Sequence, residues 1–414
     1  MRKTLISLAT ASLIVSSAMA ADKGVDFVTT GKAVLYYQTA DAGTASLFGQ
    51  TGARANAALQ LNLDADLKND FTFGSQINYL GTLGLEKNLV GNTMQDVQGK
   101  TGSTGISDDI YLSQFYIAKK IANTTVKLGR QELPKSLSPF AFSEDWNVFT
   151  NTFDAGLVVN SDIPNTTLVG AYVGGGNQNG MATNMAAYGN LTAKTNLAAP
   201  NNAIPVAGTA YMVTVQNKSL PMATITATYY DVNKVTSTTD GAKIVWGDVA
   251  IADKSLPMGL KIGVQGGQIS PDASGIDSTT AYGAMVSLDP VSALNLTLAY
   301  SSVNDGVVAV KNVGGVKTPL YTQMTLNQDA IALDADTYML KAAYNTGDYG
   351  TIIAQGTMTS AGAANKNSNK DFTDLELVYK VKAANVNYMA ILANTKVEDA
   401  ASVNTVRVVA TYAF

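Results

Sequence analysis

Strict alternation of apolar and polar residues limits how this chain can fold more than any other feature. In the segment 59–67 every odd position is Leu or Ala, and every even position is Gln, Asn or Asp. A period of two is typical of a β-strand with one apolar and one polar face, whereas a helix repeats every three or four residues. The segment 71–79 repeats the pattern after a short turn at 68–70.

The same alternation recurs to the end of the chain and predicts eighteen strands. They span 26–38, 55–67, 71–80, 109–119, 124–131, 153–160, 166–174, 208–217, 222–232, 241–252, 257–269, 278–288, 293–303, 335–345, 350–359, 371–382, 385–395 and 403–414. Short and long connections alternate, as in bacterial transmembrane barrels. The expected fold class is therefore all-β: a transmembrane antiparallel β-barrel of about 18 strands, with short periplasmic turns and long extracellular loops. A barrel of 16 strands is the alternative.

The first twenty residues have the form of an export signal. Arg2 and Lys3 precede a short apolar run, and Ala18-Met19-Ala20 has the small-x-small form of a cleavage site. The apolar run is shorter than the ~20 residues that a spanning helix needs. We therefore expect a signal peptide at 1–20 and a mature barrel at 21–414, located in the bacterial outer membrane.

Composition excludes several classes of function. Charged residues make up 14% of the chain, well below the quarter that is usual for soluble domains. Without residues 1–20 the chain keeps 26 basic and 32 acidic residues, a net charge of about −6 with no basic block, so nucleic acid is not an expected partner. The sequence has no Cys and no His, which removes thiolate catalysis, His-containing triads and His-ligated zinc, and we expect no enzyme.

The chain ends in an aromatic-tipped strand. Val406, Val408 and Ala410 share one parity with Tyr412 and Phe414. This ending resembles the last strand of bacterial outer-membrane barrels, which the barrel-assembly machinery reads, and it makes Tyr412 and Phe414 the expected assembly signal. Tyrosines near other predicted strand ends indicate an aromatic girdle at the lipid headgroups: Tyr79, Tyr300, Tyr344 and Tyr379.

The polar alternate positions indicate a wet interior. Lipid offers no hydrogen bonds, so the polar face of each strand must point inward, and barrels of about 16 to 18 strands leave an aqueous channel. The expected pore-lining residues are Gln60, Asn62, Asp64, Gln76, Lys341, Glu376 and Arg407.

The third long loop, about 132–152, is the one least suited to solvent. It holds four aromatic residues, two prolines and charges of both signs, so we expect it to fold into the barrel and narrow the pore. The predicted constriction residues are Arg130, Glu132, Lys135, Glu144 and Asp145. Arg130 shares the parity of the outward-facing Val126 and Leu128, so it faces inward only if the strand ends or bulges there. A loop folded over the barrel mouth, with its charges solvated, is the alternative.

Carboxylate pairs near strand ends raise the question of calcium. Asp108 with Asp109, Asp334 with Asp336, and Asp371 with Asp374 supply the oxygen ligands that Ca²⁺ prefers. None has EF-hand spacing, and solvated rim charge explains them more simply. We therefore predict no metal ligands and no cofactor, with Ca²⁺ as the alternative.

Three segments resemble the major outer-membrane porins of the campylobacter group, which are distantly similar to carboxylate-selective eighteen-strand porins. They are Gln114-Phe115-Tyr116-Ile117, Leu128-Gly129-Arg130-Gln131-Glu132-Leu133 and Phe153-Asp154-Ala155-Gly156-Leu157-Val158-Val159, together with the C-terminal strand. The resemblance implies a homotrimer of eighteen-stranded barrels that passes small hydrophilic solutes and cations, sometimes with bound calcium.

The leading functional hypothesis is an outer-membrane porin for passive diffusion of ions and small hydrophilic solutes. Its negative net charge makes it weakly cation-preferring. The alternatives are a solute-selective channel for small carboxylates or amino acids, a surface adhesin barrel with a plugged lumen, and a soluble secreted β-protein. Outer-membrane lipid and the assembly machinery are the other expected partners.

Overall fold

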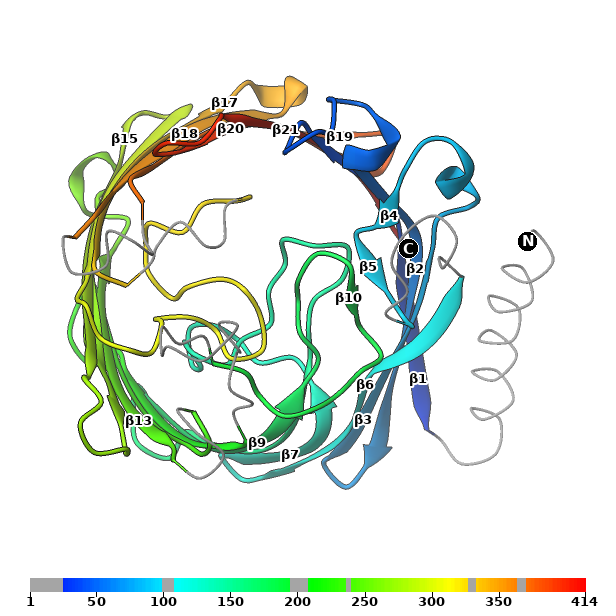
Figure 1. Ribbon diagram of the computed structural model, residues 1–414. Coiled ribbons are helices and arrows are strands. Elements are labelled where there is room, and N and C mark those ends of the chain that lie inside the picture. The colour runs from blue at the N-terminus through cyan, green and yellow to red at the C-terminus, as the bar shows by residue number, and fades with distance from the viewer. Residues whose placement is uncertain (1–24, 99–107, 194–207, 236–239, 327–332, 363–369) are drawn as a thin grey trace.

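The chain forms one closed antiparallel β-barrel in a computed structural model that describes residues 25–98, 108–193, 208–235, 240–326, 333–362 and 370–414. Seen along the barrel axis, the strands form a ring, and several loops enter it (Figure 1). The eighteen wall strands are β1 (Asp26–Ala40), β2 (Ala53–Lys68), β3 (Phe71–Gly81), β6 (Asp109–Ile121), β7 (Thr124–Gln131), β8 (Phe153–Asn160), β9 (Thr166–Gly176), β11 (Ala210–Asn217), β12 (Ala223–Val232), β13 (Ala242–Ala252), β14 (Lys261–Pro271), β15 (Thr279–Val291), β16 (Leu294–Val303), β17 (Ala335–Asn345), β18 (Thr351–Ala361), β19 (Phe372–Ala383), β20 (Val386–Val397) and β21 (Val403–Ala413).

Only short elements lie between the wall strands in the described ranges. The two-residue strands are β4 (Asn92–Thr93), β5 (Gln95–Asp96) and β10 (Thr183–Asn184), and the 3₁₀ turns are η1 (Gln50–Gly52), η2 (Leu85–Lys87), η3 (Pro257–Gly259) and η4 (Gly347–Tyr349). Within those ranges, no helix has the length and apolar character that crossing a membrane requires.

The barrel closes where the two ends of the chain meet. β1 pairs antiparallel with β21, from Lys32 opposite Ala413 to Ala40 opposite Thr405. Gly31 and Phe414 exchange two backbone hydrogen bonds of 2.8 and 2.9 Å. A Cβ on Gly31 would lie 2.6 Å from the Phe414 ring, so only glycine leaves room for the terminal aromatic residue. Closure removes the free sheet edges that an open sheet would expose.

The alternation predicted from the sequence separates the two faces of the wall. On β19, Leu375 and Leu377 are 56% and 45% exposed on the outer face, whereas the inward Asp374 and Glu376 are 0% and 3% exposed. Interstrand register preserves this alternation around the barrel, because residues directly opposite each other point to the same face. All eighteen predicted strands are present, and the fold class and the strand number are confirmed.

The main difference in strand boundaries has a local cause. The strand expected at 257–269 begins only at Lys261, because Pro257–Gly259 forms the turn η3, with Met258 at φ 52°. Pro lacks the donor that a ladder needs, so the strand starts after it. The predicted signal peptide at 1–20 lies outside the described residues.

The wall is low where the third long loop leaves it. β7 and β8 have 8 residues each, against 15 and 16 in β1 and β2. At about 3.4 Å per residue, β7 and β8 are therefore roughly 25 Å shorter than β1 and β2. This low point gives the third loop direct entry to the lumen.

Candidate functional site

Three loops cross the lumen: L3 (residues 132–152), L4 (177–209) and L7 (304–334), the last two with undescribed parts (Figure 1). L3 is held by apolar packing on two sides. Phe140 makes edge-to-face contacts with Tyr230 and Trp246 of the wall, at centroid distances of 5.9 and 5.2 Å. On the other side, Trp146, Val148 and Phe149 pack in one cluster with wall residues of β1 and β3, so aromatic burial holds the loop across the barrel.

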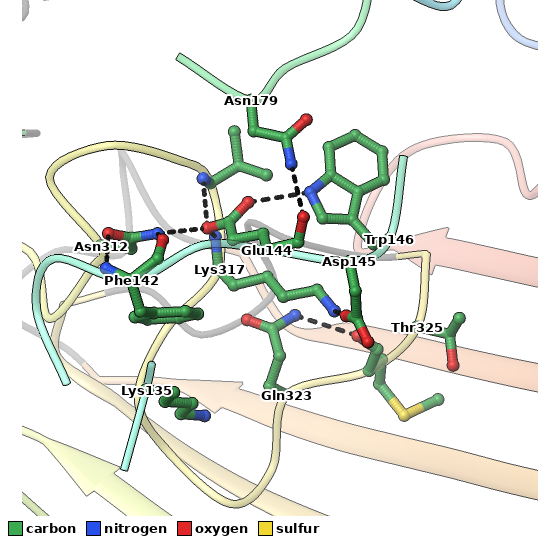
Figure 2. Close-up of polar contacts among 12 residues, drawn as sticks. Lys135, Phe142, Glu144, Asp145, Trp146, Asn179, Asn312, Lys317, Gln323 and Thr325 are labelled. Carbon is green, nitrogen blue, oxygen red and sulfur yellow. Dashed lines mark hydrogen bonds and ion pairs between the residues drawn. The ribbon is translucent and has the colours of Figure 1, made fainter. Parts of the chain in front are cut away.

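Glu144 of L3 joins this loop to L7. Its carboxylate is 1% exposed and accepts hydrogen bonds from the backbone N–H groups of Val316 and Lys317, at 2.9 and 2.8 Å. The Asn312 amide and the Trp146 indole N–H donate two more, each at 2.8 Å (Figure 2). We call this arrangement, Glu144 with its four donors, the L3–L7 clasp. A carboxylate with four N–H donors is well stabilised without a cationic partner.

Exposed charge of both signs lies next to the clasp. Asp145 is 92% exposed at its side chain, and its carboxylate is 3.6 Å from the Lys317 ammonium. Lys135 donates to the Thr318 carbonyl at 3.4 Å and lies over the Phe142 ring, 5.4 Å from its centroid. Of the five predicted constriction residues, the structure therefore brings Lys135, Glu144 and Asp145 together, and it adds Lys317 from L7 (Figure 2).

Glu132 and Arg130 lie away from this cluster. Glu132 is exposed at the start of L3 and accepts hydrogen bonds from Thr150 at 2.7 Å and Gln114 at 3.3 Å. Arg130 pairs across the ladder with Phe115 and Asp154 without a register shift, so it keeps the outward parity of Leu128. Its guanidinium forms two hydrogen bonds with Asp154, at 2.9 and 3.1 Å. It also lies over the Tyr188 ring of L4, 3.2 Å from its centroid. The structure therefore places Arg130 apart from Lys135, Glu144 and Asp145, and its part in a constriction stays a prediction.

Arg407 fastens L3 to the wall. It is 1% exposed on the inner face of β21 and donates to the Gln38 side-chain oxygen at 2.9 and 2.7 Å, and to the Trp146 carbonyl at 2.9 Å. Its guanidinium also lies 5.2 and 5.6 Å from the ring centroids of Tyr36 and Trp146. Arg407 faces inward, as the alternation predicts, but L3 covers it, so it does not touch open lumen.

Glu376 attaches L7 to the wall, as Arg407 attaches L3. It accepts backbone hydrogen bonds from Leu326 at 2.6 Å and Thr325 at 3.2 Å, and it also accepts from Gln355. Lys341 is half-buried and lies opposite Gln355 across β17 and β18. Both residues face inward as predicted, and Glu376 is an attachment point for the loop.

The predicted lining residues of β2 and β3 form a polar strip on the inner wall. Gln76 donates to Asn62 at 2.8 Å, and Asn62 donates to Thr30 at 3.0 Å. Gln60 is buried and Asp64 is exposed. Only part of this strip therefore has contact with lumen water.

Two cavities reach the rim that carries the short turns. Cavity A has a volume of about 690 Å³, and its lining includes Lys32, Lys380, Lys382, Asp145 and Asp348. Cavity B has a volume of about 550 Å³, and its charged lining is Lys135, Lys218 and Asp248. Both are large enough for a small organic solute, and lysines outnumber carboxylates in each.

Lys135 is predicted to make ion selectivity depend on pH. Its side chain keeps an exposed surface, but desolvation by the surrounding loops lowers its pKa to about 8, and the neighbouring Lys317 charge adds to this effect. Lys135 therefore loses its charge as pH rises through about 8. The ratio of anion to cation permeability should fall over this range, as measured by reversal potential in a salt gradient. Lys135→Gln should remove the change, and Lys135→Arg should keep the low-pH selectivity throughout.

The residues that sequence reasoning missed are Lys317, Asn312 and Lys32. L7 carries Gly314 and Gly315, and a Cβ on Gly315 would lie 2.2 Å from the Glu144 carboxylate oxygen. A Gly pair next to Asn and Lys was a usable signal for a close contact, but nothing in it identified L3 as the partner. Among the described residues, no group of three or more acidic side chains could hold a metal ion.

Known structures share this fold. No protein-family model and no curated protein match the chain. It is similar to Acinetobacter baumannii OccAB3, with a TM-score of 0.74 and 14% sequence identity over 94% of this chain and 99% of that chain. It is also similar to Pseudomonas aeruginosa OccK8, also called OprE, with a TM-score of 0.72 and 14% identity over 94% of this chain and 98% of that chain. A third similar structure is P. aeruginosa OpdK with vanillate, with a TM-score of 0.73 and 12% identity over 94% of this chain and 98% of that chain. At such low identity, the likeness establishes the eighteen-strand barrel architecture as the fold of this chain.

Proposed function

We propose that this protein is an outer-membrane porin through which ions and small hydrophilic solutes diffuse passively. The observation that carries the proposal is the closed eighteen-strand wall, apolar outside and polar inside, with L3 and L7 bringing charged side chains into the lumen. An apolar outer face fits lipid, and a wide barrel with a polar interior fits a water-filled path. The similarity to Occ and Opd structures supports this location and architecture.

Single-channel recording tests the proposal. Detergent-purified, folded protein in a planar bilayer should give stepwise currents in KCl. Folded protein that gives no current would refute the channel and favour the adhesin barrel with a plugged lumen.

Ion preference depends on the charge inside the lumen more than on net charge. The negative net charge predicts a weak cation preference, whereas the lysines of cavities A and B favour anions. The sign of the reversal potential in a KCl gradient decides between the two.

A channel for small carboxylates is the second candidate, supported by Lys32, Lys380 and Lys382 in cavity A and by the vanillate in the OpdK structure.

The double variant Lys380→Gln, Lys382→Gln should lower carboxylate permeability by about twofold or more, because it removes two positive charges from cavity A. Uptake into proteoliposomes, with uncharged sugars as the control solute, measures this. Equal loss for the sugar would indicate a narrowed pore and count against a carboxylate preference.

The proposal includes a cleaved signal peptide at 1–20, recognition of Tyr412 and Phe414 by the assembly machinery, and a homotrimer. The form of residues 1–20 supports the signal peptide, and the closure of the barrel at Phe414 supports the role of the C-terminal strand. The trimer rests on the resemblance to the campylobacter-group porins alone.

A further inference from the structure

A row of polar side chains crosses four neighbouring strands in cavity B. Register places Gln216 of β11 opposite Thr226 of β12. Thr226 in turn lies opposite Asp248 of β13, which lies opposite Gln265 of β14. Directly opposed residues point to the same face of a sheet, and all four side chains line cavity B. Neighbouring strands are about 4.8 Å apart, so this polar row is about 14 Å long.

The amide at one end of the polar row has an unused hydrogen-bond donor. Gln265 is 5% exposed, and its side-chain nitrogen has no hydrogen-bond partner among the described residues. The next position across the sheet is Gly283 of β15, where a Cβ would lie 3.3 Å from that nitrogen. A buried donor without an acceptor is unfavourable, so this amide indicates a ligand that supplies an oxygen.

The polar row offers donors and acceptors side by side. The Gln216 amide donates to the Thr226 hydroxyl at 3.2 Å, and the Tyr321 hydroxyl of L7 donates to the Asp248 carboxylate. These two bonds use only part of what the row can form, since an amide both donates and accepts and a carboxylate can accept about four hydrogen bonds. A molecule with several hydroxyl groups, each of which donates and accepts, matches this mixture.

An aromatic ring and small side chains shape the rest of the cavity. Nearer the short turns, Thr224 lies opposite Ala250, and Ala250 lies opposite Gly263. The Tyr321 ring lies against Gly263, where a Cβ would be 2.7 Å from the ring, so glycine makes room for it. Tyr321 and Trp246 both line the cavity. Cavity B therefore combines an aromatic side with the polar row.

We propose that cavity B binds an uncharged polyhydroxylated solute, such as a mono- or disaccharide, along the polar row. Hydroxyl groups of the solute accept from Gln265 and donate to Asp248, and its C–H groups pack on the aromatic side. A carboxylate fits less well, because it only accepts hydrogen bonds and would meet the charge of Asp248. The inference rests on the proposed porin function and adds a solute class for one of its two cavities.

Sugar-dependent block of the channel current tests the site. Glucose or sucrose, added to wild-type protein conducting KCl in a planar bilayer, should reduce the current until the site saturates. An oligo(ethylene glycol) dimethyl ether of similar size accepts hydrogen bonds but cannot donate them, so it should lower the current only in proportion to its concentration. Block that does not saturate, or equal block by the ether, would overturn the proposal while the KCl current still establishes the channel.

A matched pair of glutamine variants locates the site. Gln265→Leu should raise the half-blocking sugar concentration by about two- to tenfold, which is the usual effect of losing a neutral hydrogen bond. Gln60 of β2 is also 5% exposed and its side-chain nitrogen also lacks a described partner, but it does not line cavity B. Gln60→Leu should leave the half-blocking concentration unchanged. Equal shifts in the two variants, or none in either, would contradict the polar row as the binding site.

Tryptophan fluorescence gives a readout that does not need conduction. The two tryptophans are Trp146, which lines cavity A, and Trp246, which lines cavity B. Glucose should change the fluorescence of the detergent-purified protein saturably, and Trp246→Phe should abolish the change although Trp146 remains. The same change in Trp246→Phe would refute the site. A Trp246-dependent change in folded protein that carries no current would refute the porin and keep the sugar site.

Discussion

Replacing Glu144 by Ala should increase the single-channel conductance and make the current noisy. The change leaves four N–H donors of L3 and L7 without their acceptor, including those of Val316 and Lys317. Each buried donor left without an acceptor costs about 1–3 kcal/mol. L3 and L7 should therefore separate far enough for water to form hydrogen bonds with these donors. The tip of L7 then moves relative to L3, and the path between them widens and fluctuates. Planar-bilayer recording of the purified variant measures this.

Two further variants make the test specific. Asp145→Asn removes a neighbouring charge that is 92% exposed, so it should shift the reversal potential while the current stays quiet. Gly315→Ala disrupts the clasp from the L7 side, because its Cβ would lie 2.2 Å from the Glu144 oxygen, and it should reproduce the noise. A quiet current of unchanged size in both Glu144→Ala and Gly315→Ala would show that the clasp does not control the opening.

Replacing Arg407 by Ala should lower the thermal stability of the folded barrel and release L3 from the wall. The buried guanidinium donates three hydrogen bonds, two to Gln38 and one to the Trp146 carbonyl. Hydrogen bonds to charged groups contribute about 1.5–3 kcal/mol each, and removal also leaves an empty space between the Tyr36 and Trp146 rings. We expect a loss of at least about 3 kcal/mol, seen as a lower temperature of the heat-induced gel shift, together with a larger conductance.

Arg54 provides the matched control. It also lies on the inner wall, but its only side-chain hydrogen bond to a described residue is the long one, 3.4 Å, to the Thr93 carbonyl. Arg54→Ala should therefore leave both measurements nearly unchanged. Arg407→Lys should have an effect between those of Arg54→Ala and Arg407→Ala, because an ammonium cannot form the forked hydrogen bonds with which the guanidinium joins Gln38 and Trp146. Equal effects of Arg54→Ala and Arg407→Ala would contradict the assigned role.

Much of the wall was predictable because its information is local. The strands 124–131, 153–160 and 335–345 were predicted with the boundaries that the structure shows. In each, the alternation of side chains reports directly which face meets which environment. The inward direction of Glu376 and Arg407 followed from the same rule.

The candidate site was predictable only in part, because its decisive contacts join distant segments. L3 was identified from its aromatic residues and prolines, and Lys135 and Asp145 lie in the lumen beside Lys317. Glu144 was selected for its charge, yet it is buried and meets L7 more than 160 residues away. Arg130 lies apart from this cluster, as its outward parity in the sequence indicates.

The sequence by itself determined the barrel and the face on which each wall side chain lies, since a closed sheet between lipid and water imposes a period of two. It indicated eighteen strands but left sixteen open, and the closed structure decided for eighteen. The tertiary structure alone decided that L7 and L3 meet at Glu144, that L3 covers Arg407, and that Glu376 holds the end of L7. Those features depend on which loops share the lumen once the barrel has closed. No local pattern in a loop specifies its partner, because hydrogen bonds between loops need only complementary groups at the same place in space.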